Sequence, residues 1–426
     1  MSYAVCDLMR MLERSVSAYH TVSEAEAFLR DNGFSALHLG GAFPVETGGR
    51  YYVSCGTSLA AFTVGEKPAV LRIAAAHTDS PCLRVKSSPE SVAGGCCRLN
   101  IEPYGGMIQN TWLDRPLSLA GAVMLYTDDP MKPERRLVKW DEPLLTIPNL
   151  AIHINRDVNK GVALKANIDL LPICRTVEES WEKDGYFLKT LASKLGVSAE
   201  EIASFELTVY CAEKPALVGF AQDMLSSPRL DNITSVHACL NALVQANGAG
   251  LNVAVLYDNE EIGSNTRRGA DSSFLSVLLE KIALALGMRR EEMLDACVSG
   301  MFLSCDAAHA VHPNHPELAD PSCAPYLNRG VALKRSASYS SEAETCAIVA
   351  ALCKKNAIPL QIYRNRADQP GGGTVGSMAT ALLAMPGADI GVPILAMHSA
   401  RELMGVKDQE ALCRLCEAFF AEGAHE

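Results

Sequence analysis

The sequence predicts an α/β fold, with a mixed, largely parallel sheet flanked by helices and an inserted β-rich domain. Its 426 residues are enough for two or three domains with cores of their own. After residue 226, strand-like and helix-like segments alternate, which is typical of a largely parallel sheet covered on both faces. Near residue 91 the pattern changes to short strands rich in Pro and Gly. We therefore expect a main domain in two parts, 1–90 and 221–426, and an inserted domain at 91–220.

Two helices are expected to open the chain. Apolar residues at helical spacing predict the first over Cys6–Tyr19. Ser23 and Glu26 form a capping-box pattern for the second, which is expected to stop at Asn32-Gly33. Three short apolar runs separated by turn residues then predict strands at 51–55, 60–64 and 69–76.

The regular second half supplies the alternating elements, whereas the inserted domain has one expected helix, near 177–195. Helices are expected at 232–246, 272–286, 342–356, 371–383 and 409–421. Strands are expected at 251–257, 301–304, 358–363 and 389–396. This order places each strand beside a helix that can cover the sheet.

Composition excludes several classes of protein. A net charge of −11 without a basic run argues against nucleic acid as a partner. No apolar run approaches the ~18 residues of a membrane span, so we expect no membrane partner. The 15 scattered cysteines and an opening segment without a signal-peptide pattern predict a cytoplasmic protein.

Four expected strands end in residue types that bind metals. The strand at 69–76 leads into His77-Thr78-Asp79, and the strand at 251–257 leads into Glu260-Glu261. Asp306 and His398 follow the strands at 301–304 and 389–396. Because ligands collect at the carboxyl ends of strands in open α/β sheets, these residues are expected to converge. Asp231, at the start of an expected helix, is a fifth candidate.

Two histidines and three carboxylates suit two zinc-like ions about 3.5–4 Å apart. One carboxylate must then bridge the ions, and Asp231 is our choice. Asp79 is placed to hold the far nitrogen of His77. One of the adjacent Glu260 and Glu261 can bind metal while the other acts as a general base. Each residue alone has a simpler explanation, such as a packed histidine, an exposed turn or a helix cap, but their recurrence at strand ends favours a metal site.

Five segments resemble the aspartyl aminopeptidase family of dinuclear zinc peptidases, and they occur in the family's order. They are HTDSP at His77, RLDN at Asp231, DNEEIGS at Glu260-Glu261, SCDAAHAVHPN at Asp306 and AMHSARE at His398. The resemblance implies that Asp231 bridges two Zn²⁺ ions per subunit. It implies His77 and Asp306 on one zinc, Glu261 and His398 on the other, Glu260 as catalytic base and Asp79 as partner of His77. Oxygen and nitrogen ligands also suit Co²⁺ or Mn²⁺.

The resemblance also implies an assembly. In the family, an inserted dimerisation domain splits the catalytic domain, and dimers form a tetrahedral dodecamer. His153, in NLAIHINRDVNKG, matches a histidine that reaches a neighbouring subunit's active site, although an ordinary interface role is the alternative. His312, in the loop after Asp306, is expected to support a metal ligand or face the substrate, and a structural role is the alternative. Gly373 lies at the opening of an expected helix whose amides can hold an anion or a substrate carbonyl, and an ordinary tight turn is the alternative.

The implied substrates are peptides with a free amino terminus, and acid-selective members of the family prefer Asp or Glu there. Such a preference requires a basic residue in the pocket, for which Lys334 is the candidate. The stretch from Lys334 to Tyr339 is shorter than in acid-selective members, so a neutral preference is an alternative. Two alternatives to an aminopeptidase are a dinuclear zinc acyl-amino-acid deacylase and a non-catalytic assembly protein.

Overall fold

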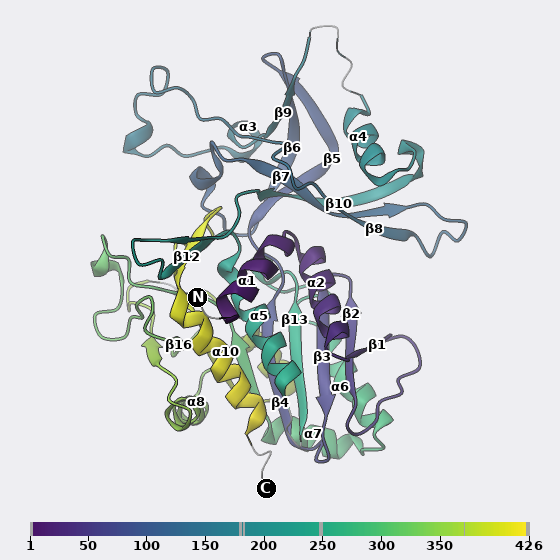
Figure 1. Ribbon diagram of the computed structural model, residues 1–426, viewed down its shortest axis with the longest axis vertical. Helices are drawn as coiled ribbons and strands as arrows, with labels where there is room; N and C mark the ends of the chain where they lie inside the picture. Colours follow the sequence, from purple (N-terminus) through teal and green to yellow (C-terminus); the bar gives the residue numbers. More distant parts are fainter. Residues whose placement is uncertain (1–2, 179–180, 182–183, 247–249, 370, 423–426) are drawn as a thin grey trace. The chain divides into compact units, whose positions relative to one another are not determined.

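The computed structural model describes residues 3–178, 181, 184–246, 250–369 and 371–422 (Figure 1). The chain divides into two compact units. The first comprises residues 1–79, 215–397 and 402–426, and the second comprises 80–214 and 398–401. The junction expected at 90/91 falls inside a single strand, β5 (Cys82–Ala93), because that strand begins the second unit and pairs along most of its length with β6 (Cys96–Tyr104).

The first unit is built on a nine-stranded sheet. Its order is β1 (Ser35–Leu37), β2 (Arg50–Cys55), β3 (Ser58–Val64), β13 (Leu251–Tyr257), β4 (Leu71–His77), β14 (Met301–Cys305), β18 (Gly387–Gly391), β16 (Val331–Lys334) and β17 (Leu360–Tyr363). The four central strands, β13, β4, β14 and β18, run parallel. Strands β3 and β16 join them antiparallel on either side. The predicted mixed, largely parallel sheet is therefore confirmed.

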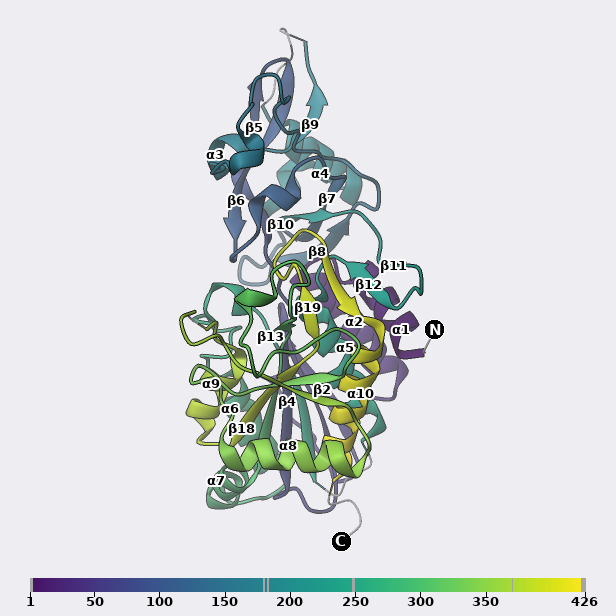
Figure 2. The same ribbon diagram turned by 90° about the vertical axis from the view of Figure 1, so that its left-hand side faces the viewer.

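Helices cover both faces of this sheet (Figures 1 and 2). Alternate residues of β4 explain why, because Ala74 and Ala76 belong to one apolar core whereas Ile73 and Ala75 belong to another. The first core contains α1 (Tyr3–Arg14), α2 (Ala18–Asp31), α5 (Leu230–Gln245), α8 (Ala343–Lys355) and α10 (Val406–Ala421). The second contains α6 (Phe274–Ala285), α7 (Arg290–Ser299) and α9 (Val375–Leu383).

The first two helices differ from the prediction. The expected helix over Cys6–Tyr19 is wrong, because α1 ends at Arg14 and α2 begins at Ala18. Ser17 caps α2 by accepting a hydrogen bond from the His20 amide, so Ser23 lies inside the helix rather than at its cap. Helix α7 was not predicted, because its sequence REEMLDACVS has few apolar residues to reveal a buried face.

The strand expected at 389–396 is also two strands. Strand β18 stays in the large sheet, whereas β19 (Pro393–Leu395) joins a separate five-stranded sheet. Pro393 explains the break, because it has no amide hydrogen to continue the ladder. The order of the small sheet is β11 (Ala216–Val218), β12 (Met224–Ser227), β20 (Glu402–Gly405), β19 and β15 (Ala308–His309).

The second unit is β-rich, with one antiparallel sheet of six strands. The order is β8 (Glu134–Lys139), β7 (Leu117–Leu125), β10 (Ile202–Cys211), β5, β6 and β9 (Ile173–Thr176). Among the described residues of this unit, two α-helices accompany the sheet, α3 (Ala166–Asp169) and α4 (Tyr186–Leu195). The helix expected near 177–195 is therefore shorter than predicted, and part of its first half lies outside the described residues. Across the described chain, no helix has the length and apolar character needed to cross a membrane.

Candidate metal centre

Three adjacent parallel strands bring four of the predicted residues to one edge of the large sheet. His77 is the last residue of β4, and Asp306 follows β14 directly. Glu260 and Glu261 lie in a short 3-10 turn just after β13. Because Tyr257 of β13 pairs with His77 and β14 runs parallel on the other side of β4, all three strands end at the same level.

Asp231 reaches this edge from the start of α5. Its backbone is not helical, with φ of −79° and ψ of 106°, and its carboxylate faces His77. Its amide donates to Glu402 Oε2 at 3.1 Å, and the next residue, Asn232, donates from Nδ2 to the Cys305 carbonyl at 2.8 Å. These two contacts fix the backbone and direct the Asp231 carboxylate toward His77.

His77, Asp231 and Asp306 form a compact and buried cluster. His77 Nε2 lies 3.3 Å from Asp231 Oδ1 and 3.4 Å from Asp306 Oδ1. Ligand atoms about 2.0–2.1 Å from a tetrahedral zinc ion are about 3.4 Å apart, so these separations fit ligands of one ion. His77, Glu260 and Glu261 form a second group whose ligand atoms lie within 4.8 Å of one another.

Asp79 ties the histidine to the turn that carries the two glutamates. His77 Nδ1 lies 3.1 Å from the Asp79 backbone carbonyl and 3.3 Å from its Oδ1. The Asp79 carboxylate also accepts the amides of Glu260 and Glu261, each at 3.2 Å. The backbone carbonyl is thus the closer partner of Nδ1, and the carboxylate chiefly orders the turn. Both contacts leave Nε2 as the nitrogen facing Asp231 and Asp306.

The carboxylates dominate the electrostatics of this cluster. Burial lowers the pKa of His77, but Asp231, Asp306 and Asp79 outweigh burial and raise that pKa well above its ordinary value. Burial raises the pKa of Glu260 to about 7; His77 opposes this shift, and the neighbouring carboxylates add to it. So much negative charge in a buried place is suited to binding cations.

Comparison with known proteins decides the family. A family model described as "Aminopeptidase I zinc metalloprotease (M18)" matches residues 11–420. The chain belongs to this family. It is therefore a zinc metalloaminopeptidase, a hydrolase, as predicted.

Relatives and solved structures agree with this assignment. A probable M18 family aminopeptidase 2 from Clostridium novyi is 40% identical, over 97% of this chain and 98% of the relative. The matching chain in a cryo-EM structure of the Ape4 and Nbr1 complex is 31% identical, with a TM-score of 0.94 over 98% of this chain and 85% of that one. An M18 family aminopeptidase from Thermotoga maritima is 25% identical, with a TM-score of 0.87 over 98% of this chain and 95% of that one.

The last predicted ligand of the aminopeptidase, His398, belongs to the second compact unit. There its Nδ1 lies 3.0 Å from the Gly106 carbonyl, and its backbone is left-handed, with φ of 66°. With Nδ1 turned to a carbonyl oxygen, Nε2 is the nitrogen that would bind a metal. The metal role of His398 stays a prediction.

Lys334 lies deep in the first unit of the aminopeptidase. Its side chain is buried, with Nζ 3.3 Å from Asp306 Oδ2 and 5.3 Å from the centre of the Tyr339 ring. Burial lowers the pKa of Lys334, but Asp306 and its neighbours outweigh it and raise that pKa above the ordinary value. The ammonium group is therefore charged and already faces a carboxylate of the cluster.

The other predicted substrate residues lie in separate places. His312 is exposed and lines a cavity of about 350 Å³ together with His309 and Tyr363. Gly373 is exposed, and a Cβ added there would meet no atom within 4 Å. His153 is exposed in the second unit. Their substrate roles stay predictions.

Sequence reasoning missed Asp389, a fully buried residue of β18. Its Oδ1 accepts the Thr374 hydroxyl at 2.5 Å, and its Oδ2 accepts the Ser340 amide at 2.7 Å and the Ser340 hydroxyl at 2.6 Å. Asp389 also pairs in register with Lys334. It thereby holds the loop after β16 and the start of α9. A single acid inside an apolar strand gave no pattern that would have identified it.

Replacing Asp389 with Asn is expected to destabilise the protein by about 1–3 kcal/mol, because a donor would then face hydroxyl and amide donors inside the core. The melting temperature should fall, and limited proteolysis should cut the 336–341 segment faster. An Asp368→Asn variant, at an exposed aspartate, is the control and should match wild type. Equal melting and cleavage in the two variants would contradict the role of Asp389.

Proposed function

We propose that this chain is a dinuclear zinc aminopeptidase that hydrolyses the first peptide bond of peptides with a free amino terminus. The observation that carries the proposal is the meeting of His77, Asp231 and Asp306 beside the Glu260-Glu261 turn. A structural zinc site is usually closed and rich in cysteine, whereas this cluster is rich in carboxylates and has a glutamate to spare. That composition favours catalysis over a purely structural role.

The metal roles follow the sequence prediction. Asp231 would bridge two ions, with His77 and Asp306 on one and Glu261 and His398 on the other. When bound, zinc polarises the scissile carbonyl, acidifies water and holds the substrate's amino group. Co²⁺ and Mn²⁺ also suit this ligand set.

Glu260 is the proposed general base, with Asp79 as its positioning residue. The Asp79 carboxylate holds the amides of both glutamates, so their side chains leave the turn from a fixed backbone. Glu261 would serve the metal, and the Glu260 carboxylate would take the proton of the attacking water. Glu260 would then return that proton to the leaving amine.

We propose a preference for acidic amino-terminal residues, which Lys334 would recognise by charge. A neutral preference, for residues such as Leu, is the second candidate, and one observation favours it. The Lys334 ammonium already lies 3.3 Å from Asp306 Oδ2, so part of its charge is balanced before a substrate arrives.

A cleavage panel tests the substrate class. Matched peptides beginning with Asp, Glu, Leu, Lys and N-acetyl-Asp are incubated with purified protein, with and without a chelator. We expect chelator-sensitive release of Asp and Glu, at rates at least about tenfold above Leu, because a charge-assisted contact is worth about 1.5–3 kcal/mol.

The other outcomes separate the alternatives. Faster release of Leu would keep the aminopeptidase and refute the acidic preference. Cleavage of the acetylated peptide alone would indicate a deacylase, because a deacylase needs no free amine. No cleavage by folded, zinc-loaded protein would support a non-catalytic assembly protein.

We also propose that the second unit mediates dimerisation and that dimers form a tetrahedral dodecamer. Leu150, Ile152 and Ile154 are exposed apolar residues around His153, which is the character expected of a surface that another subunit covers. His153 would then reach a neighbouring active site. Light scattering coupled to gel filtration measures the assembly directly.

We also propose a cytoplasmic location for the protein.

A further inference from the structure

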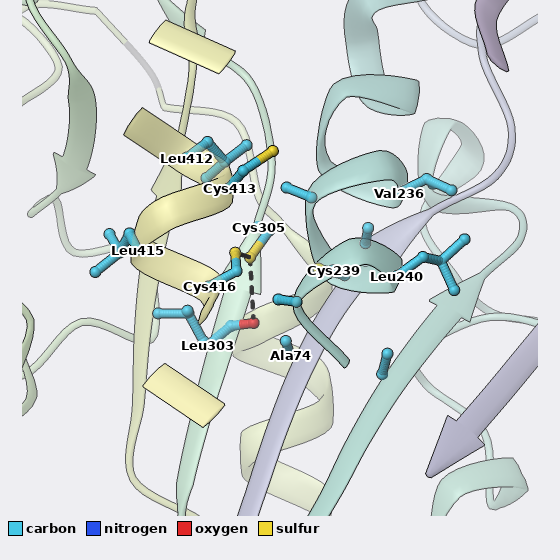
Figure 3. Close-up of a cluster of buried hydrophobic side chains, with 14 of the residues drawn as sticks. Ala74, Val236, Cys239, Leu240, Leu303, Cys305, Leu412, Cys413, Leu415 and Cys416 are labelled. Atoms are coloured by element: carbon cyan, nitrogen blue, oxygen red, sulfur yellow. Dashed lines mark hydrogen bonds between the residues drawn. The ribbon is translucent and has the colours of Figure 1, made fainter. Parts of the chain in front are cut away.

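Three buried cysteines meet behind the metal centre. Cys239 of α5, Cys305 of β14 and Cys416 of α10 are fully buried, and their sulfur atoms all lie within 4.8 Å of one another. The sulfurs of Cys305 and Cys416 are 3.9 Å apart (Figure 3). Cys413, one turn earlier on α10, points its sulfur away from this group in the same view. We call Cys239, Cys305 and Cys416 the thiol cluster.

The spacing of the thiol cluster suits one metal ion. Three sulfurs bound at about 2.3 Å, the length of a zinc–sulfur bond, would lie about 4.0 Å apart around a planar centre. The observed 3.9 Å separation matches this value, and the 4.8 Å limit on the others requires only a small contraction. Each sulfur comes from a different element, so an ion would join α5, β14 and α10.

The ligand type selects the ion. Thiolates favour soft ions such as monovalent copper, whereas the nearby carboxylates and His77 suit zinc. The surroundings are apolar, with Ala74, Leu240 and Leu303 in the same core. Zinc usually takes four ligands, so a group of three sulfurs suits monovalent copper better. The sulfurs bind the ion as thiolates, and the protons that they lose leave to solvent.

The thiol cluster is covalently joined to the metal centre. Cys305 precedes Asp306 in the chain, and its carbonyl accepts the Asn232 side chain at 2.8 Å, next to Asp231. Any contraction of the three sulfurs would therefore move the backbone that positions Asp231 and Asp306. Access requires only local opening of α10, which is the last helix of the described chain.

We propose that Cys239, Cys305 and Cys416 form a binding site for a soft metal ion of the monovalent copper type, and that its occupation inhibits the peptidase. Cysteine in a core otherwise behaves as a small apolar residue. Metal binding separates these two roles, because a metal site retains an ion whereas packed core cysteines do not.

The test adds Cu⁺ alone to the zinc-loaded protein without oxygen, against a soluble copper chelator. Elemental analysis counts copper and zinc per chain, and peptide cleavage reports activity. Wild type should retain one copper that the Cys416→Ala variant does not. Copper should slow wild-type turnover about tenfold or more while zinc stays bound. Changes in the groups that surround metal ligands typically lower activity by this amount. The Cys416→Ala variant should keep its turnover.

Cys353→Ala is the matched control, since Cys353 is also a buried helical cysteine of the same core but lies outside the thiol cluster. It should bind copper and be inhibited like wild type. If Cys416→Ala fails to fold, Cys239→Ala on α5 takes its place. Equal copper retention by wild type and the cluster variant would overturn the site. Loss of zinc from wild type as copper enters would overturn the proposed route of inhibition.

Discussion

Replacing Glu260 with Gln is expected to lower kcat by about 10²–10⁴-fold while the zinc content stays unchanged. The amide has nearly the size of the carboxylate but cannot accept the proton of the attacking water. The backbone contact from Glu260 to Asp79 does not involve the replaced group, so the turn should keep its shape. Steady-state kinetics on the preferred peptide, with elemental analysis of zinc, measure both quantities.

Two further variants separate the loss of a general base from the loss of a metal ligand and from a general effect of removing an acid. Glu261→Gln, at the neighbouring residue, should lose zinc as well as activity, because Glu261 is the proposed ligand. Glu292→Gln changes an acid of α7 that pairs with Arg289, and it should match wild type in both measurements. Unchanged turnover in Glu260→Gln would remove Glu260 from the mechanism, and loss of zinc would make it a ligand.

The large sheet was predictable because its strands carry long apolar runs bounded by turn residues. The runs that became β2, β3, β4 and β13 were each placed to within two residues. Strands β3, β4 and β13 are buried along nearly their whole length, which requires apolar runs, so the signal is local and strong. The end of each run also marks the edge of the sheet, and that is why His77 and Asp306 could be identified without coordinates.

Other features depend on contacts between distant segments, which leave little local pattern. The small sheet unites strands from residues 216 to 405, several of only two to four residues. Short strands of this kind do not show a clear alternation of polar and apolar residues. Strand β16 was missed for the same reason. Its Lys334 therefore could be named as a candidate from the family resemblance, but not placed against Asp306.

The first two helices illustrate a different difficulty. Two serines compete to begin α2, since Ser17 and Ser23 both precede residues suited to a helix. Ser23 has the stronger local pattern, with Glu26 three residues on. The structure uses Ser17, and the earlier start lets Val22 be buried in the first core. Tertiary burial outweighs a capping pattern worth about 1 kcal/mol.

Replacing Asp231 with Asn is expected to lower the zinc content by about half or more and turnover by about 10²-fold or more. Asp231 is the proposed bridge, so its loss should affect both ions rather than one. The Asn amide is equal in size, but it offers one neutral oxygen in place of the two oxygens of a charged carboxylate. The Asp231 amide that binds Glu402 belongs to the backbone and is retained, so the start of α5 should persist.

The control for Asp231→Asn must separate metal binding from the general cost of changing a buried acid. Asp408 of α10 is equally buried, and its carboxylate accepts the amides of Asn328 and Gly330 at 2.7 and 2.8 Å. Asp408→Asn should therefore lower the melting temperature and leave zinc bound. If both variants lost zinc to the same extent, the loss would reflect instability, and the bridging role of Asp231 would have no support. Full zinc occupancy in folded Asp231→Asn would refute that role directly.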